Sequence, residues 1–213
     1  MDFKVWKTIK IGTGLKTADD FRGAFCIQRY RISDWAKDFL DQPTFTVSNT
    51  ESEINLVNVS VAELGFTEEA MLRGIYARAK EMGLGICPAE VGPQLRLQYD
   101  DQPMDEFLSV GMEPIADSDR VLGVFRVGRV GDGLWLYACS GHPVSLWRPD
   151  RRWVFVLSKS VTRPLGTSTT SNLDTKSTTK QPPLQPVWNF MEENGFTEAI
   201  LKRGDGTNIT FNL

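Results

Sequence analysis

Residues 167–181 read TSTTSNLDTKSTTKQ, and this stretch decides how the chain is divided. Among its residues only Leu173 is strongly apolar. A segment of this composition buries too little apolar surface to offset the entropy lost when it is ordered. Pro182, Pro183 and Pro186 follow and stiffen its end. We therefore predict a compact domain over residues 1–159, a Ser/Thr/Pro-rich linker over 160–186 and an apolar docking tail over 187–213.

The predicted tail is short and rich in large apolar side chains, including Trp188, Phe190, Met191 and Phe211. A segment of this size rarely forms a core of its own without disulfides or a metal. Its sequence predicts a short helix, then a hairpin that turns at residues 204–206. We expect these apolar side chains to dock on the body, on a second copy of the chain or on a partner protein.

The bulk composition is that of an ordinary globular protein. The 213 residues are 41% apolar, and acidic and basic residues are mixed to a net charge of −3. No basic stripe marks a nucleic-acid surface, and no run of 18 apolar residues predicts a membrane span. The N-terminus lacks the apolar middle of a secretory signal, and Cys26, Cys87 and Cys139 are odd in number. Free thiols in a cytoplasmic protein are the simplest interpretation.

The order of expected elements predicts an α+β fold. The N-terminal half mixes strands with two to four helices, the first of which begins at Thr17 and the second at Ser33. The clearest helix starts near Thr67 and ends at Gly83. Four strands separated by turns then predict a C-terminal antiparallel meander. These strands cover residues 107–110, 121–127, 134–139 and 153–157.

A glycine-rich turn is the first candidate site. Gly12, Gly14, Lys16 and Thr17 stand between an expected strand and an expected helix, which is the layout of a phosphate-binding loop. The nucleotide-binding loop needs four residues between its glycines and a glycine directly before its lysine, and neither is present. The spacing favours a tight turn leading into an N-cap. Beside Lys16, the free helix N-terminus would still attract an anion.

The second candidate is built on His142, the only histidine of the chain. A cysteine or serine nucleophile most often uses histidine as its base, so such chemistry would combine Cys139 with His142, oriented by Asp150. The alternative is a buried thiol followed by an exposed turn histidine. Cys87, Cys139 and His142 together would offer three zinc ligands. Only one of the short spacings typical of a zinc site is present, so we expect no metal and no cofactor.

The third candidate is an aromatic and basic group. Trp147 lies between prolines and is followed by Arg148 and Arg151. Tryptophan beside arginine is common where proteins bind ligands or other proteins, so we expect Trp147 to be partly exposed and to bind. Trp135 and Trp153 are instead expected to be core partners on adjacent strands.

Four segments of the body resemble a group of small bacterial proteins known only as hypothetical translations. They are TIKIGTGLKTADDFR, SVAELGF, IYARAKEMGLGICPAEVGPQLRLQY and the closing DGLWL with RWVFV. The similarity covers most of residues 5–159. It carries no activity, cofactor or site residue, and it implies only that the body is a self-contained unit.

The leading hypothesis is a non-catalytic interaction or assembly module whose tail docks through Trp188 and Phe190. One alternative is a small cytoplasmic enzyme that uses Cys139 or His142 near Trp147. Another is a winged helix over residues 67–99 that binds nucleic acid. Acidic residues outnumber basic ones in that segment, which disfavours a recognition helix.

Overall fold

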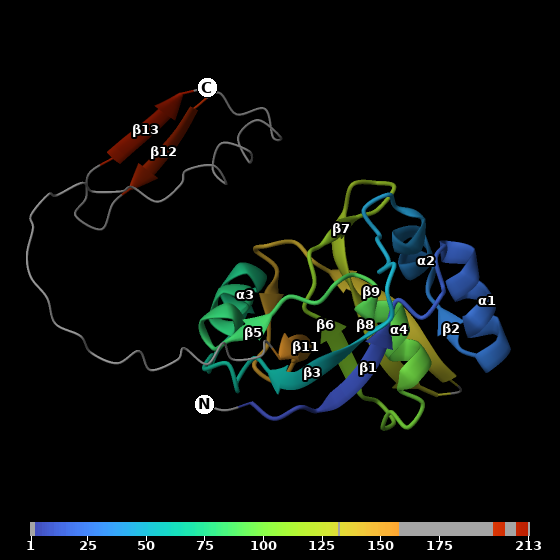
Figure 1. Cartoon of the computed structure of the whole chain (residues 1–213). Coiled ribbons are helices and arrows are strands. Elements are labelled where there is room, and N and C mark those ends of the chain that lie inside the picture. Colours follow the sequence, from blue (N-terminus) through green and yellow to red (C-terminus); the bar gives the residue numbers. More distant parts are fainter. Residues whose placement is uncertain (1–2, 132, 158–197, 203–207, 213) are drawn as a thin grey trace, which may run out of the picture. The chain divides into compact units, whose positions relative to one another are not determined.

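The computed structural model describes residues 3–131, 133–157, 198–202 and 208–212. The chain divides into two compact units, Met1–Thr162 and Arg163–Leu213. Among the described residues of the first unit, four helices accompany a nine-stranded sheet, so the α+β prediction is confirmed (Figure 1). The buried apolar core of this unit runs from Ile9 to Phe155 and is one cluster. Every residue of this described cluster belongs to the first unit.

The large sheet has the strand order β1-β3-β11-β6-β8-β9-β2, with β5 paired to β11 and β7 paired to β8. Its pairs are antiparallel except β11 with β6 and β2 with β9. Two further strands, β4 and β10, form a small antiparallel pair beside it. The bounds are β1 Lys7–Ile11, β2 Arg31–Ile32, β3 Ser52–Ser60, β4 Ala70–Met71, β5 Leu84–Gly85, β6 Phe107–Val110, β7 Ile115–Ala116, β8 Leu122–Val130, β9 Gly133–Ser140, β10 Leu146–Trp147 and β11 Arg152–Leu157.

The helices are α1 (Ala18–Gln28), α2 (Asp34–Asp41), α3 (Leu72–Glu81) and α4 (Val91–Gln98). Thr17 and Ser33 cap the first two through their side chains, as predicted. The third begins at Leu72 and not near Thr67, because β4 pairs with β10 immediately before it. Three- and four-residue spacing then buries Leu72, Ile75 and Ala79 on one side of the helix.

The helices pack on opposite faces of the sheet (Figure 1). Helix α4 lies so close to β8 that a Cβ at Gly92 would meet the Cβ of Phe125 at 2.5 Å. On the other face, Tyr76 of α3 packs edge-on against Trp153 and Phe155 of β11. Strand residues alternate between faces, so everything in register with Trp153 on neighbouring strands shares the α3 face.

The predicted meander is confirmed for three strands and corrected for the fourth. Strands β6, β8 and β9 follow one another in antiparallel pairs. Strand β11 does not continue beyond β9, because β2 already pairs with that edge. The connection over residues 141–151 instead carries the chain back to the space between β3 and β6. In that central place Trp153, Val154 and Phe155 are fully buried.

In the second unit the structure describes β12 (Glu198–Lys202) and β13 (Asn208–Asn212), which pair antiparallel. This confirms the predicted hairpin. The expected turn at residues 204–206, the expected helix that holds Trp188, Phe190 and Met191, and the predicted linker lie outside the described residues. No helix among the described residues is long and apolar enough to cross a membrane.

Candidate functional site

The glycine-rich turn is occupied by a carboxylate of the chain itself. Gly12 has φ +66°, and its N–H donates to Oε1 of the fully buried Glu90 at 2.7 Å. The same carboxylate accepts from the Ser48 N–H at 2.9 Å and from Gln94 Nε2 at 3.0 Å. Glu90, directly before α4, thus holds two loops together by three hydrogen bonds.

The backbone N–H groups before α1 also donate to a carboxylate of the chain itself. Asp20 accepts from the backbone N–H groups of Lys16 and Thr17 and has its pKa lowered by these bonds. The Lys16 amino group donates to the Ser48 carbonyl at 2.8 Å. The structure therefore gives no support to the anion site expected at Gly12, Gly14, Lys16 and Thr17.

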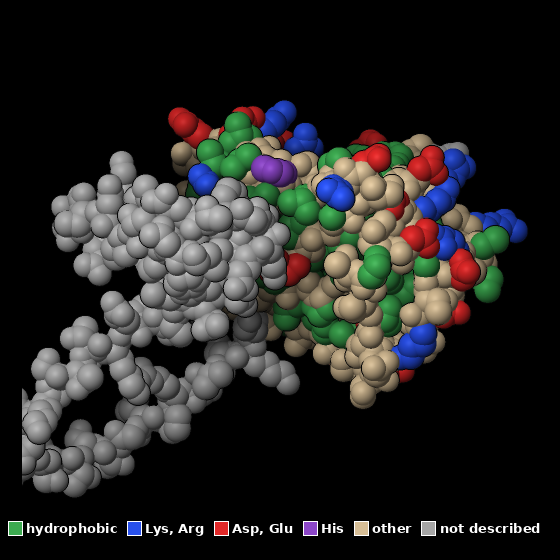
Figure 2. Space-filling view, turned by 90° about the horizontal axis from the view of Figure 1, so that it is seen from above, with side chains coloured by type: hydrophobic (Ala, Val, Ile, Leu, Met, Phe, Trp, Pro, Cys, Tyr) green, Lys and Arg blue, Asp and Glu red, His purple; other side chains and the backbone are tan. Residues whose placement is uncertain are grey.

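The three expected catalytic residues do not form a catalytic group. The Cys139 thiol lies 3.7 Å from Ser109 Oγ, and burial raises its pKa to about 11, so it is protonated at neutral pH. His142 is exposed and is the purple side chain of Figure 2, while Asp150 pairs with Arg148 at 3.1 Å. Within the described residues no hydrogen bond joins Cys139, His142 and Asp150, and no group of acids, cysteines and histidine could hold a metal ion.

Two tryptophan predictions are corrected. Trp147 is only 9% exposed, because β10 presses its ring against Trp153 with 4.6 Å between ring centroids. Trp135 is the partly exposed one, stacked on Tyr137 at 5.2 Å with the Arg31 guanidinium over it. Trp135 and Trp153 are not partners, since β9 and β11 are not adjacent.

The residues around Trp147 nevertheless form a hollow. A cavity of about 450 Å³ opens there, and it holds Arg148 and Arg151, as the sequence predicted for this group. It also brings in Arg126 from β8, which sequence reasoning missed because the residue is distant along the chain. The cavity is lined by Glu69, Arg126, Ser140, Ser145, Leu146, Trp147, Arg148 and Arg151.

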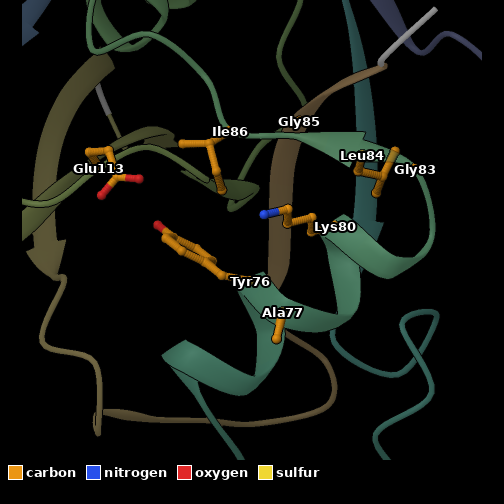
Figure 3. A pocket seen from close by; sticks show the side chains of 8 residues that line it. All are labelled: Tyr76, Ala77, Lys80, Gly83, Leu84, Gly85, Ile86 and Glu113. Atoms are coloured by element: carbon orange, nitrogen blue, oxygen red, sulfur yellow. The ribbon is translucent and has the colours of Figure 1, made fainter. Parts of the chain in front are cut away.

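The larger cavity, about 510 Å³, was not predicted (Figure 3). It lies between α3 and the segment that contains β5, and its surface is mainly apolar. The Tyr76 hydroxyl donates to the Met112 carbonyl at 2.8 Å, and burial raises its pKa. Tyr76 is therefore a neutral wall and not a base. The lining residues are Tyr76, Ala77, Lys80, Gly83, Leu84, Gly85, Ile86 and Glu113.

Two charges stand at this apolar cavity without neutralising each other. Lys80 reaches from α3 into the space, whereas Glu113 approaches from the opposite segment (Figure 3). Both are exposed, and in the described part of the chain neither forms an ion pair with the other. An apolar surface with one cation and one anion that have no ion-pair partner in the described residues can hold an amphipathic peptide, with its apolar side chains inside and its charges paired at the rim.

The end of the body lies beside this cavity. Leu157, the last described residue of β11, pairs with Leu84 of β5, and Leu84 lines the cavity. Among the described strands β5 pairs only with β11, so it is an edge strand. The sequence could have indicated one wall of this site, because Ala77 and Lys80 lie on the exposed side of the amphipathic helix. The opposite wall could not be predicted, because the position of β5 depends on the fold.

Of the remaining predicted binding residues, Trp188, Phe190 and Met191 lie outside the described residues, and Phe211 belongs to β13. The segment expected to form a winged helix contains α3 and α4 with β5 between them. Residues Val91 to Arg96 of α4 are buried, which leaves most of that helix no surface for a DNA groove. Basic and acidic side chains alternate over the face shown in Figure 2.

Comparison of the chain with family models, curated proteins and solved structures found no match. The function has to be inferred from the geometry of the two cavities.

Proposed function

We propose that the protein is a non-catalytic interaction module in which the tail, residues 187–213, docks into the apolar cavity between α3 and β5 of its own body. The observation that carries this proposal is the position of Leu157. The chain leaves the described body in a strand pair whose other member, Leu84, lines the cavity. The segment that follows therefore starts at the rim of the site.

The chemistry of the tail suits this cavity. Trp188, Phe190 and Met191 supply large apolar side chains, and Glu192 and Glu193 follow directly. The cavity offers apolar walls with the amino group of Lys80 inside. Apolar side chains entering the cavity and an acid meeting this lysine would satisfy both sets of groups.

The length of the connecting chain permits docking in cis. From residue 157 to residue 187 the chain can span at most about 100 Å, at about 3.3–3.6 Å per residue. Tethering also raises the effective concentration of the tail at the body toward the millimolar range. A contact too weak to hold separate molecules together can therefore be formed most of the time within a single chain. This favours docking of the body's own tail over docking of the tail of a second copy.

The contact has a measurable size. Burial of one large apolar side chain contributes about 1.5–3 kcal/mol. We expect Trp188→Ala to weaken docking by about that amount, which is roughly 10- to 150-fold in the equilibrium constant.

The test uses the full-length chain with a specific protease site inserted between residues 167 and 181. After cleavage of the folded protein, the tail fragment is expected to elute with the body in size-exclusion chromatography. Ala77→Arg places a charged side chain at the wall of the cavity from an exposed helix position and should release the fragment. Ala62→Arg makes the same change at an exposed residue outside the cavity, and should not release it.

Two results would contradict docking in cis. Loss of the fragment from the unmodified body immediately after cleavage would show that the tail does not dock there. A dimeric mass of the uncut chain that becomes monomeric in Ala77→Arg would move the tail to the cavity of a second copy. Light scattering on the uncut chain, before and after the substitution, distinguishes these cases.

A further inference from the structure

The cavity beside Trp147 contains an arginine that has no counter-ion among the described residues. Arg126 on β8 is in register with Ser109 of β6, which is in register with Trp153 of β11. The Arg126 side chain therefore lies on the α3 face of the sheet, in the row that Trp147 covers. It is partly buried, with its guanidinium 4.3 Å from the ring centroid of Phe107.

Within the described residues the Arg126 guanidinium forms no hydrogen bond and no ion pair, and its Nε is fully buried without a partner. Burial lowers its pKa, and the nearby Arg151 lowers it further. Two guanidinium groups thus repel each other at one wall of the cavity. A partly buried charge left unpaired is costly, and proteins normally pair such a group or use it to bind a ligand.

Further donors lie on other residues that line the same cavity. The hydroxyls of Ser140 and Ser145 lie 2.7 Å apart, so one O–H donates to the other oxygen and the second remains free. The cavity therefore offers several N–H and O–H donors, and Glu69 is the one acid that lines it.

We propose that this cavity binds a phosphate group, free or at the end of a small molecule, held by Arg126 and Arg151 with the hydroxyls of Ser140 and Ser145 as further donors. A tetrahedral phosphate presents acceptor oxygens in several directions, whereas a carboxylate presents two in one plane. Donors contributed by β8, β9 and the turn before β11 match the tetrahedral group. Arginine is also the side chain best suited to phosphate, because its fork of N–H groups binds two oxygens together.

The volume and the rim indicate where the rest of a ligand would lie. A cavity of about 450 Å³ is in the range of small-molecule sites and exceeds the space of a phosphate ion alone. Glu69 is exposed at its edge and forms no ion pair in the described residues. Its negative charge opposes the phosphate, so removal of this charge should strengthen binding while removal of either arginine should weaken it.

The experiment is isothermal titration of the full-length protein with inorganic phosphate, glycerol 3-phosphate and acetate at one ionic strength set with chloride. We expect saturable binding of phosphate or its ester, and weaker binding of acetate. Arg126→Gln and Arg151→Gln should each reduce the affinity at least tenfold, and Glu69→Gln should raise it. Arg120→Gln removes an equal charge from an exposed turn outside the cavity and should change nothing.

Tighter binding of the ester would identify a phosphorylated small molecule as the ligand, and equal binding would identify phosphate itself. The proposal is overturned by the absence of saturable binding of either probe. It is also overturned if acetate binds as tightly, or if Arg120→Gln weakens binding as much as the two cavity variants do. Arg151 is exposed, so its variant stays informative even if Arg126→Gln does not fold.

Discussion

Replacing Glu90 by alanine should destabilise the body more than any surface change. Its carboxylate accepts from the N–H groups of Gly12 and Ser48 and from Gln94, all in a fully buried place. An orphaned buried N–H costs about 1–3 kcal/mol, and two backbone donors lose their acceptor here. Relief of the buried charge returns part of this cost, so we expect Glu90→Ala to lower the free energy of unfolding by about 3–5 kcal/mol.

The measurement is urea denaturation of the full-length chain, followed by tryptophan fluorescence. Glu90→Gln keeps one carbonyl acceptor but turns an NH₂ group toward a donor, so its loss should be about half that of alanine. Glu53→Ala, at an exposed position of β3, should cost less than about 0.5 kcal/mol. A loss below about 1 kcal/mol for Glu90→Ala would refute the idea that this carboxylate holds the two loops.

Rescue of Glu90→Ala by a small added anion tests the same role of the carboxylate. If the turn at Gly12 is an anion site filled from inside, removal of the Glu90 side chain leaves that site empty. Formate or acetate should then stabilise Glu90→Ala and not the unmodified chain, because a ligand that binds only the folded state adds RT ln(1 + [L]/Kd). Equal responses of the two proteins to added formate would contradict this account.

Other changes test other parts of the structure. Gly12→Ala should lose at least about 2 kcal/mol in the same assay, since its Cβ would meet the Thr50 carbonyl oxygen at 2.2 Å with φ at +66°. Iodoacetamide at pH 8 should modify the exposed Cys26 well before Cys139 in peptide mass mapping; the raised pKa of Cys139, about 11, keeps it a thiol until the pH approaches that value. Arg126→Met should leave the melting temperature unchanged or raise it, because it replaces an unpaired, partly buried charge with an apolar side chain of similar length.

The features that sequence predicted well are local ones. A threonine or serine before a helix caps it through atoms two or three residues away, so Thr17 and Ser33 could be assigned without knowledge of the fold. The same holds for the β12–β13 hairpin, whose strands are neighbours along the chain. The helix α3 was also predicted, because its periodicity depends only on residues of one helix.

The features that sequence reasoning missed depend on pairing between strands that are distant along the chain. The start of α3 was misplaced because β4 pairs with β10, about 75 residues later. That pairing also buries Trp147, which composition alone made look like an exposed loop residue between prolines. The place of β11 followed from β2 occupying the edge of β9, a contact between residues about 100 positions apart. Local patterns carry no information on such competition for a sheet edge.

The buried charges of the body separate structural groups from a binding candidate. Glu90 is satisfied by three donors, and Arg96, which is fully buried, donates to Gln102 and to the Tyr99 carbonyl. Glu90 joins two loops, and Arg96 holds the turn that follows α4 through residues close to it along the chain. In the described structure the Arg126 guanidinium has no hydrogen-bond or ion-pair partner; the Phe107 ring lies beneath it and Arg151 is nearby. Of these three groups only Arg126 lines the cavity beside Trp147, and this supports the proposal that the cavity binds an anion.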